Sequence, residues 1–393
     1  MRKVTALVLL SGLFAFTFAA RAAAEDRPRN IILIGWDGAQ RNHVNEALER
    51  GDLPNLKKLS GEGTMVEIDV YGTTDTKAGW SEILSGYGPK KTGVYSNREY
   101  QPVPTGYSVF ERLESHFGDD NFVTVAVIGK KSHCGERNPP RKIRLDEAKK
   151  DAGQAAGDKA KAGAKRPAKQ EGKIVVEDGV RYRVIPGSPY YHMADNTDVW
   201  IFGLTEDEKV GTQALKLLDE NKDKPFFFFV HFAEVDQKGH KHGENSKEYN
   251  DALVSNDKWT DKIVAKLKEL GLYDKTLIYV TADHGFDEGK TSHGNAPFVF
   301  LATNDKQVKR SGRRDDITPT ILDRFGLDLC KLDPALDGRS LTRDDDRPKP
   351  EVPPGRPKQQ PKKQAKAKAR KAALALPAAE PAEKLLLADN LNP

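Results

Sequence analysis

The sequence predicts an α/β fold, a three-layer α/β/α sandwich with a mostly parallel central sheet. Short apolar runs of strand length alternate along the chain with amphipathic segments of helix length, which is the order of repeated βαβ units. Candidate polar side chains follow several of these runs directly. Because right-handed crossovers bring the carboxyl ends of parallel strands to one edge of the sheet, we expect these side chains to meet there.

Residues 1–24 are predicted to be a cleavable signal peptide. Arg2 and Lys3 precede an apolar run over residues 4–18, and three alanines at 22–24 provide a cleavage site. The run is shorter than the roughly 20 residues of a membrane helix, so a retained anchor is the weaker interpretation. We therefore expect a secreted or periplasmic protein with no transmembrane span in its mature chain.

Two segments are predicted to be exposed and disordered. Residues 146–173 form a low-complexity insertion of Ala, Lys, Gly and Asp, and residues 343–393 form a tail rich in Pro, Lys, Ala and Gln. Both segments and the signal peptide are basic, so the remaining body is acidic although the whole chain carries +5. An acidic body favours a metal-binding core over a nucleic-acid groove. We expect one folded domain over residues 25–342 and no specific nucleic-acid partner.

The first predicted strand, residues 29–34, runs into Gly-Trp-Asp-Gly, which places Asp37 at its end. An aspartate in such a turn is either a metal ligand or a helix N-cap. A short helix from Pro54 and a strand over residues 66–71 are expected next.

Hydroxyl groups gather after that second strand, at Thr73, Thr74 and Thr76, just before a helix expected to end at Gly86. The free N–H groups and the positive dipole end of a helix stabilise an anion or a developing alkoxide. Thr76 is therefore either a helix N-cap or a nucleophile.

The middle of the chain continues the alternation. We expect a helix over 108–117, a strand over 122–128 followed by Lys130 and His133, a hairpin over 174–185 and a helix over 206–220. Residues 226–232 are the most apolar run after the signal peptide and predict a central strand buried on both faces. Asp236 and His240 are expected in the loop after it, before a helix capped by Asn245 and Glu248.

The last predicted strands carry two further motifs. Residues 277–281 form a strand that ends at Asp283-His284-Gly285, and His293 follows nine residues after His284. A strand over 297–303 and a helix over 317–325 complete the domain.

Six carboxylate or imidazole side chains and one hydroxyl thus follow predicted strands: Asp37, Asp236, His240, Asp283, His284, His293 and Thr76. Mixed sets of this size suit two zinc-like divalent ions, with Mn or another divalent metal left open. Two ions a few ångströms apart can hold an attacking and a leaving oxygen in line, as phosphoryl transfer needs. The set is complete without His242, which we expect to be a spectator.

Together these motifs resemble the alkaline phosphatase-like superfamily, especially its type I phosphodiesterase and nucleotide pyrophosphatase branch, over about residues 29–342. The resemblance implies that Thr76 is the nucleophile and that Asn97, 21 positions later, binds phosphate. It assigns one ion to Asp37, Thr76, Asp283 and His284, and the other to Asp236, His240 and His293.

The chain departs from that branch in one place and resembles sulfatases in another. Lys77-Ala78 follows Thr76, where the branch usually has an aromatic residue and a proline. Gly129-Lys130 with His133 resembles the sulfatase motif that binds sulfate. The alternative is that Lys130 and His133 are solvated loop residues. Lys77 and Lys130 could also supply the positive charge that a phosphate monoester needs.

We therefore expect a metal-dependent hydrolase of a small-molecule or headgroup phosphate ester, with diesters favoured, that acts through a phosphothreonine intermediate. Asn97 and the backbone N–H of Lys77 would hold the non-bridging oxygens. The alternatives are a sulfatase-like hydrolase, a phosphomonoesterase or phospho-headgroup transferase, and a non-catalytic binding protein. The pairing of Cys134 with Cys330 and the oligomeric state stay open.

Overall fold

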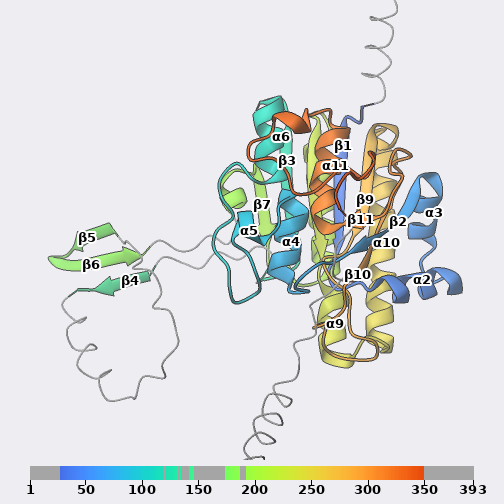
Figure 1. The fold of residues 1–393 in the computed structure, drawn as a ribbon, viewed down its shortest axis with the longest axis horizontal. Helices are drawn as coiled ribbons and strands as arrows, with labels where there is room; N and C mark the ends of the chain where they lie inside the picture. The colour runs from blue at the N-terminus through green and yellow to red at the C-terminus, as the bar shows by residue number, and fades with distance from the viewer. Residues whose placement is uncertain are drawn as a thin grey trace, which may run out of the picture. The chain divides into compact units, whose positions relative to one another are not determined.

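An eight-stranded sheet forms the centre of the protein in the computed structural model, which describes residues 27–118, 120–131, 133, 141–145, 173–185 and 192–348. The strand order is β11-β2-β10-β9-β1-β8-β3-β7, and only β10 runs antiparallel to its neighbours (Figure 1). The predicted mostly parallel sheet is therefore confirmed. Its strands are β1 Asn30–Trp36, β2 Thr64–Asp69, β3 Val123–Ile128, β7 Val199–Phe202, β8 Phe226–Phe232, β9 Thr276–Thr281, β10 Phe298–Thr303 and β11 Gly312–Arg313.

Helices cover both faces of this sheet, which confirms the predicted three-layer sandwich (Figure 1). One layer contains α2 Arg41–Arg50, α3 Pro54–Glu62, α8 Asp207–Glu220 and α10 Lys247–Glu269. The other contains α4 Thr76–Ser85, α6 Val109–Phe117 and α11 Ile317–Arg324. Shorter elements join them: α5 Pro89–Thr92, α9 Glu234–His242, and the 3-10 turns η1 His192–Asp195, η2 Tyr273–Lys275, η3 Arg314–Asp316 and η4 Leu329–Lys331.

Two adjacent interior strands, β1 and β8, explain why the apolar runs that predicted them were so clear in the sequence. Every residue of β1 and of β8 is buried, because helices pack over both sides of these strands. Apolar runs without polar alternation are what such strands require. One polar residue breaks the run in β8, His231, and its side chain is fully buried.

Two local predictions around α9 and α10 are wrong. Asp236 and His240 lie on helix α9 rather than in a loop, one turn apart on the same face. The cap of α10 is Ser246, whose hydroxyl accepts a hydrogen bond from the Tyr249 N–H at 3.1 Å. Asn245, the predicted cap, donates instead to Glu288 at 2.8 Å, which ties the start of α10 to the loop after β9.

The predicted hairpin over residues 174–185 is confirmed by β5 Lys173–Glu177 and β6 Val180–Ile185, which pair antiparallel around Gly179. A third strand, β4 Arg141–Arg144, joins them in a separate sheet of order β4-β6-β5. Gly179 has a φ of 75°, which a glycine adopts without strain. Residues 1–24, most of the insertion, the tail beyond 348 and Cys134 lie outside the described residues.

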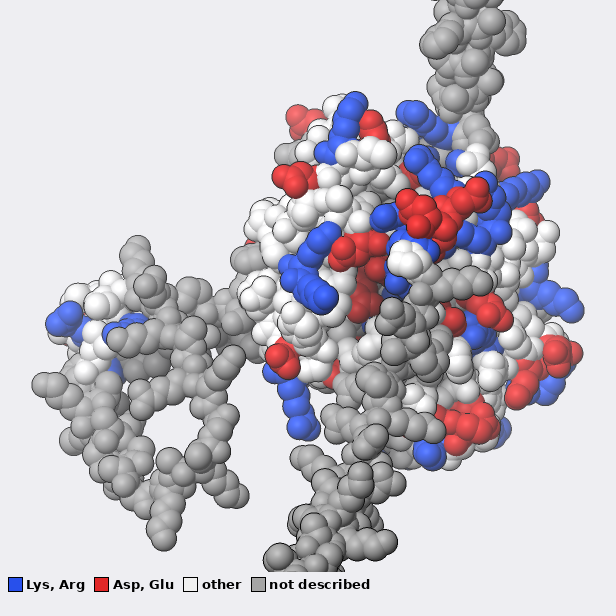
Figure 2. All heavy atoms as spheres, viewed as in Figure 1, with Lys and Arg blue, Asp and Glu red and all other residues white. Residues whose placement is uncertain are grey.

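Residues 343–348 continue past the predicted boundary at 342 and contact the body through charged side chains. Arg347 Nη2 lies 2.8 Å from Asp316 and 2.6 Å from Asp345. On the face of the protein turned toward the viewer in Figure 2, acidic and basic side chains of the described residues lie next to one another. No helix in the described part of the chain is both long and apolar enough to cross a membrane.

Candidate metal and phosphate site

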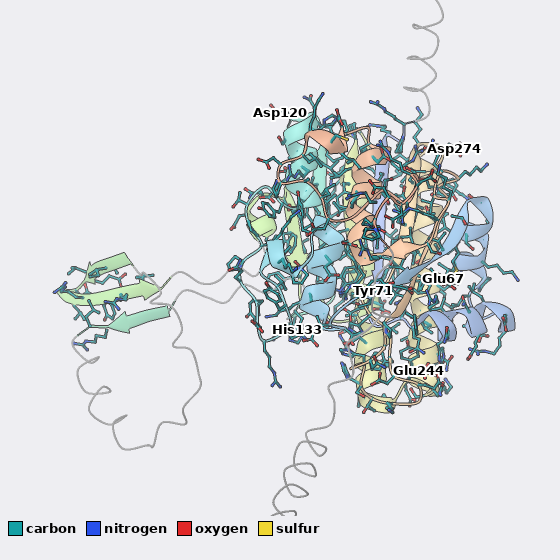
Figure 3. All side chains as sticks on the ribbon, viewed as in Figure 1. Glu67, Tyr71, Asp120, His133, Glu244 and Asp274 are labelled. Carbon is teal, nitrogen blue, oxygen red and sulfur yellow. The ribbon has the colours of Figure 1, made fainter. Side chains whose placement is uncertain are left out.

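The predicted ligands gather at the carboxyl edge of the parallel strands. Asp37 follows β1, α9 follows β8, and Asp283 follows β9, while the register of β1 with both neighbours aligns the three strand ends. In Figure 3, His133, which follows β3, lies at this end of the sheet. Asp120 and Asp274, which precede β3 and β9, lie at the opposite end. The topology therefore brings residues far apart in sequence to one edge, as expected for such sheets.

Two groups of side chains could each hold a metal ion. One group is Asp236 with His240 and His293, and the other is Asp37 with Asp236 and His284, so Asp236 belongs to both. Within each group the ligand atoms lie within 4.8 Å of one another. His240 Nε2 lies 3.1 Å from His293 Nε2 and 3.3 Å from Asp236 Oδ1. Asp283 stands outside both groups, although its Oδ2 is 3.4 Å from His284 Nε2.

Buried carboxylate oxygens show that these residues fit a divalent cation. Asp37 Oδ1, Asp236 Oδ1 and Asp283 Oδ2 are inaccessible to solvent. They lie beside nitrogen atoms: Lys130 Nζ is 3.0 Å from Asp37, His240 Nε2 is 3.3 Å from Asp236, and His284 Nε2 is 3.4 Å from Asp283. Buried carboxylates are costly unless cations balance their charge. Lys130 supplies one positive charge, with Nζ at 3.0 Å from Asp37 Oδ1 and 2.7 Å from Asp236 Oδ2. One ammonium group does not balance three carboxylates, so the donor set suits added metal charge.

The pKa values of the three carboxyl groups separate because of this crowding. Burial raises the pKa of Asp236, but Lys130, His240 and His284 together outweigh that effect and hold it well below its usual range. The pKa of Asp37 is likewise lowered, since Lys130 and His231 outweigh its burial. Burial and the neighbouring Asp37 raise the pKa of Asp283 well above its usual range. Asp283 therefore binds a proton more readily than an ordinary carboxyl group, and a bound cation would oppose this.

The imidazoles are oriented by their second nitrogens. His284 Nδ1 lies 2.9 Å from the carbonyl oxygen of Gly285, and His240 Nδ1 lies 2.9 Å from that of Thr291. Each neutral ring therefore carries its proton on Nδ1 and directs the Nε2 lone pair into the site. Burial, followed by the adjacent His284, lowers the pKa of His293 to about 3, so the His293 ring is neutral at physiological pH. In contrast, the hydrogen bond with Asp236 raises the pKa of His240.

Thr76 is the first residue of α4 and is buried beside these groups. Its Oγ1 lies 3.2 Å from His284 Nε2 and 3.2 Å from Lys130 Nζ. The N-cap of α4 is Asp75, so Thr76 is not the helix cap that the simpler interpretation required. The hydroxyl instead faces the candidate metal groups from the positive end of a ten-residue helix.

The other predicted substrate-binding residues surround Thr76. The Lys77 N–H donates to Asn97 Oδ1 at 2.9 Å, so the two predicted phosphate donors are bonded to each other. Lys77 Nζ lies 3.3 Å from the centre of the Tyr100 ring. Lys130 is not a solvated loop residue, because its side chain is only 11% exposed. Burial lowers the pKa of His133, and the charges of Lys130 and Lys77 lower it further.

Four supporting residues were not predicted: His231, Trp80, Glu82 and Arg314. His231 and Trp80 both donate to Asp37, and Arg314 pairs with Glu82 while it donates to the Asp283 carbonyl. A histidine inside an apolar strand is a sequence signal that could have identified His231. Nothing in the local sequence distinguishes Arg314 from its basic neighbours.

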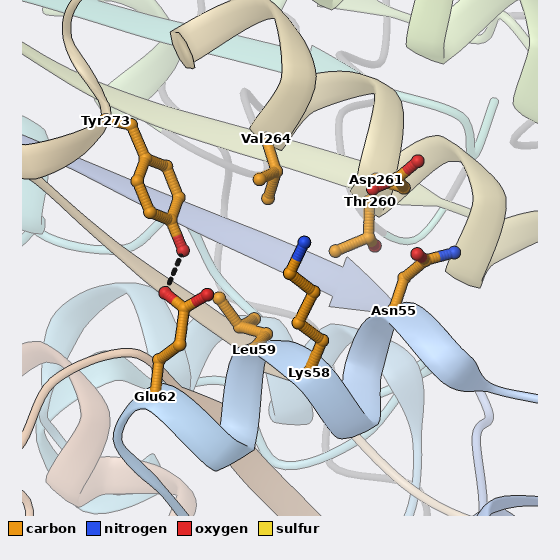
Figure 4. Close-up of a pocket in the computed structure, with 8 residues that line it drawn as sticks. All are labelled: Asn55, Lys58, Leu59, Glu62, Thr260, Asp261, Val264 and Tyr273. Carbon is orange, nitrogen blue, oxygen red and sulfur yellow. Dashed lines mark hydrogen bonds between the residues drawn. The ribbon is translucent and has the colours of Figure 1, made fainter.

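Figure 4 shows a pocket elsewhere in the protein, between α3 and α10. Its volume is about 10 Å³, room for about one water molecule. Tyr273 donates a hydrogen bond to Glu62 across it. Both residues precede strands, β9 and β2, so this pocket lies toward the sheet edge opposite the candidate site.

The model of one protein family, type I phosphodiesterase / nucleotide pyrophosphatase, matches residues 31–322. The chain belongs to this family. The match spans every predicted ligand, and it confirms the resemblance drawn from the motifs.

Known relatives of this type I phosphodiesterase family member are distant. Bis(5'-adenosyl)-triphosphatase ENPP4 of Pongo abelii is 22% identical over 288 residues, which cover 73% of this chain and 53% of the relative. The chain thus spans about half the length of that relative. Steryl-sulfatase of Rattus norvegicus is 35% identical over 175 residues, or 35% of this chain and 29% of the relative. A solved alkaline phosphatase superfamily protein from Vibrio parahaemolyticus has a TM-score of 0.49 at 15% identity, over 81% of this chain and 70% of that chain.

Proposed function

We propose that this protein is a metal-dependent hydrolase of phosphate esters, with a preference for diesters. The observation that carries this proposal is the position of the Thr76 hydroxyl. It lies at the first residue of α4, 3.2 Å from an imidazole that itself belongs to a buried group of candidate metal ligands. A nucleophile placed at a helix N-terminus beside such a group is suited to attack on phosphorus.

Two ions of zinc, or of manganese or another divalent metal, would bind at this edge, with Asp236 close enough to contribute to both sites. Asp37, Thr76, Asp283 and His284 would hold one, and Asp236, His240 and His293 the other. When bound, these ions would lower the pKa of the Thr76 hydroxyl and offset the negative charge of the phosphate.

The reaction would proceed in two displacements. Thr76 Oγ1 attacks phosphorus, the bond from phosphorus to the leaving oxygen breaks, and the leaving alcohol takes up a proton. Asn97 and the N–H groups at the start of α4 hold the non-bridging oxygens as charge develops on them. Water then attacks the phosphothreonine, which releases the phosphate product and returns the hydroxyl to Thr76.

The basic side chains around Thr76 favour a second candidate function. Lys130 Nζ lies 3.2 Å from Thr76 Oγ1, and the positive charges of Lys77 and Lys130 both lower the pKa of His133. Extra positive charge suits a dianionic phosphate monoester, and the partial similarity to steryl-sulfatase makes sulfate esters a further substrate to test.

The leader composition of residues 1–24 supports export to the periplasm or the cell exterior, which N-terminal sequencing of fractionated protein would test.

The function is tested by assaying metal-loaded protein on aryl phosphodiester, phosphomonoester and sulfate ester substrates. We expect the diester to be hydrolysed fastest. The Thr76→Ala variant should lose activity by a factor on the order of 10³ or more, as removal of a nucleophile does. The Thr76→Ser variant, which keeps a hydroxyl, should retain measurable turnover. His242→Ala is a matched control, since His242 is a neighbouring histidine outside both ligand groups.

Four outcomes would contradict parts of this proposal. Equal turnover by Thr76→Ala would exclude the nucleophile, and preference for a sulfate ester would change the reaction class. Product that carries an added acceptor alcohol, in place of hydrolysis, would identify a transferase. Absence of turnover on all three substrates by a protein that binds metal would favour a binding function.

A further inference from the structure

The two oxygens of Asp37 have different surroundings. Oδ2 lies 2.9 Å from His231 Nε2 and accepts a hydrogen bond from Trp80 Nε1 at 3.1 Å. Oδ1 receives neither of these hydrogen bonds. It faces the centre of the site, where it forms an ion pair with Lys130 Nζ at 3.0 Å and lies 3.8 Å from His284 Nε2. The rings of His231 and Trp80 thus bind one oxygen, while the other faces Lys130 and the candidate ligands.

Both residues that contact Oδ2 are fixed by packing. His231 lies on the central strand β8, and Trp80 lies on α4; both side chains are fully buried. The Trp80 ring packs edge-on against His231, with ring centres 5.0 Å apart, and against Phe229 at 5.1 Å. Gly35 makes this packing feasible, because a Cβ at that position would lie 2.3 Å from the Trp80 ring.

We propose that His231 and Trp80 are positioning residues that make Asp37 a metal ligand through Oδ1 alone. This inference rests on the proposed function, because it takes Asp37 to be a metal ligand. Hydrogen bonds to Oδ2 orient the carboxylate, as supporting hydrogen bonds do for the ligands of other metal sites. Without them, the carboxylate can rotate and its second oxygen can compete for the ion or for Lys130.

The same pair links metal binding to the nucleophile. Trp80 follows Thr76 by four residues on α4, which is one turn of the same helix. A carboxylate that is oriented by Trp80 therefore also fixes the distance between the ion at Asp37 and the Thr76 hydroxyl. The group of Asp236, His240 and His293 includes neither Asp37 nor its two hydrogen-bond partners, so the second ion should not respond directly.

The test uses the full chain and measures zinc binding by competition with a chromophoric chelator. His231→Leu removes the donor, His231→Gln returns a nitrogen near the position of Nε2, and Trp80→Phe removes the N–H but keeps an aromatic ring. We expect His231→Leu to weaken one of the two zinc sites by about 10- to 100-fold and to leave the other unchanged. His231→Gln should recover most of the affinity. In cobalt-substituted protein, Trp80→Phe should change the visible spectrum of one ion only.

The outcomes distinguish failure of the proposed function from failure of this inference alone. Wild-type protein that binds none of zinc, cobalt and manganese would overturn the proposed function and this inference with it. Wild-type protein that binds two ions, while folded His231→Leu binds both with wild-type affinity, would overturn the inference alone. Equal weakening of both sites would show that His231 has only a general structural role. Should His231→Leu fail to fold, an unchanged affinity and cobalt spectrum in Trp80→Phe would likewise overturn the inference.

Discussion

Arg314 Nη1 donates a hydrogen bond of 2.9 Å to the main-chain carbonyl of Asp283. The same guanidinium pairs with Glu82 of α4 through Nη2 at 2.8 Å, and it donates to the Thr73 carbonyl at 3.1 Å. One buried cation therefore joins the loop before α4, helix α4 itself and the loop that carries Asp283, His284 and His293.

Breaking this ion pair should destabilise the protein strongly. Removal of one partner leaves a buried charge uncompensated, so we expect Glu82→Gln or Arg314→Gln to lower the free energy of unfolding by about 3–5 kcal/mol. Denaturant unfolding at pH 8.5 measures this change. Burial raises the pKa of Glu82 to about 7, even beside Arg314. The carboxyl group is therefore mostly ionised at pH 8.5. Lys247→Gln, which breaks the exposed pair with Asp251, is the control and should change stability little. A similar small effect from Glu82→Gln would contradict this account.

A methyl group at Gly35 should be poorly tolerated. Its Cβ would meet the buried Trp80 ring at 2.3 Å, and the ring has no room to move. We expect Gly35→Ala to destabilise the protein by about 1–3 kcal/mol through overpacking, measured by denaturant unfolding. Gly61→Ala is the matched control, since a Cβ on that α3 residue would meet nothing within 4 Å and should be neutral or stabilising. Equal effects from the two substitutions would show that the contact with Trp80 is unimportant.

Metal removal should lower both stability and activity. Divalent ions would bind the buried carboxylates of the folded state, so metal at 100 times its dissociation constant should add about 2.7 kcal/mol per site. Thermal unfolding with and without chelator, followed by metal replacement, measures the effect. His293→Ala should lose one ion per chain by metal analysis, whereas His242→Ala should keep both. Retention of two ions by His293→Ala would show that His293 is not a ligand.

The stability of the wild type should depend on pH through His43. The ring lies between two acceptor oxygens, with Nδ1 2.6 Å from Glu244 and Nε2 2.8 Å from Asn250. Burial lowers the pKa of His43, but its bonds to Glu244 and Asn250 outweigh that effect and raise it above the ordinary 6.5. The folded state therefore binds the proton more tightly than the unfolded chain, and this stabilisation is complete below pH 6.5 and lost as pH rises through the raised pKa.

Comparison with His43→Gln isolates this contribution. The difference in unfolding free energy between wild type and variant should be larger at pH 5.5 than at pH 9. A difference that stays constant between these values would mean that His43 does not bind an extra proton on folding.

The sequence predicted the central strands, and the place of the candidate ligands at one edge of the sheet, for a physical reason. Strands such as β1 and β8 are buried on both faces, so their composition is nearly all apolar and their ends are sharp. Asp37 follows β1 directly, and Asp283 lies two residues after the end of β9. Parallel topology then brings them together without any further information from the side chains.

The predictions that failed depended on contacts between distant segments. Helix α9 was missed because its nine residues are mostly polar and contain Gly239. That glycine is needed where a Cβ would lie 2.6 Å from the Phe286 ring, a contact that only the folded chain shows. Asn245 was taken for a helix cap because it precedes Glu248 by three residues, but its partner is Glu288 on another loop. The role of Arg314 likewise depends on Asp283, 31 residues away.

The connection between β9 and β10 carries Asp283, His284 and His293, and it begins and ends on adjacent antiparallel strands. This connection joins two strands that are close in sequence, so its three side chains need no other strand to become neighbours. Asp37 follows β1, whereas Asp236 and His240 lie on α9 after β8, and both strands reach the same edge only after long crossovers. The complete set of candidate ligands therefore exists only once β1 and β8 have joined the sheet.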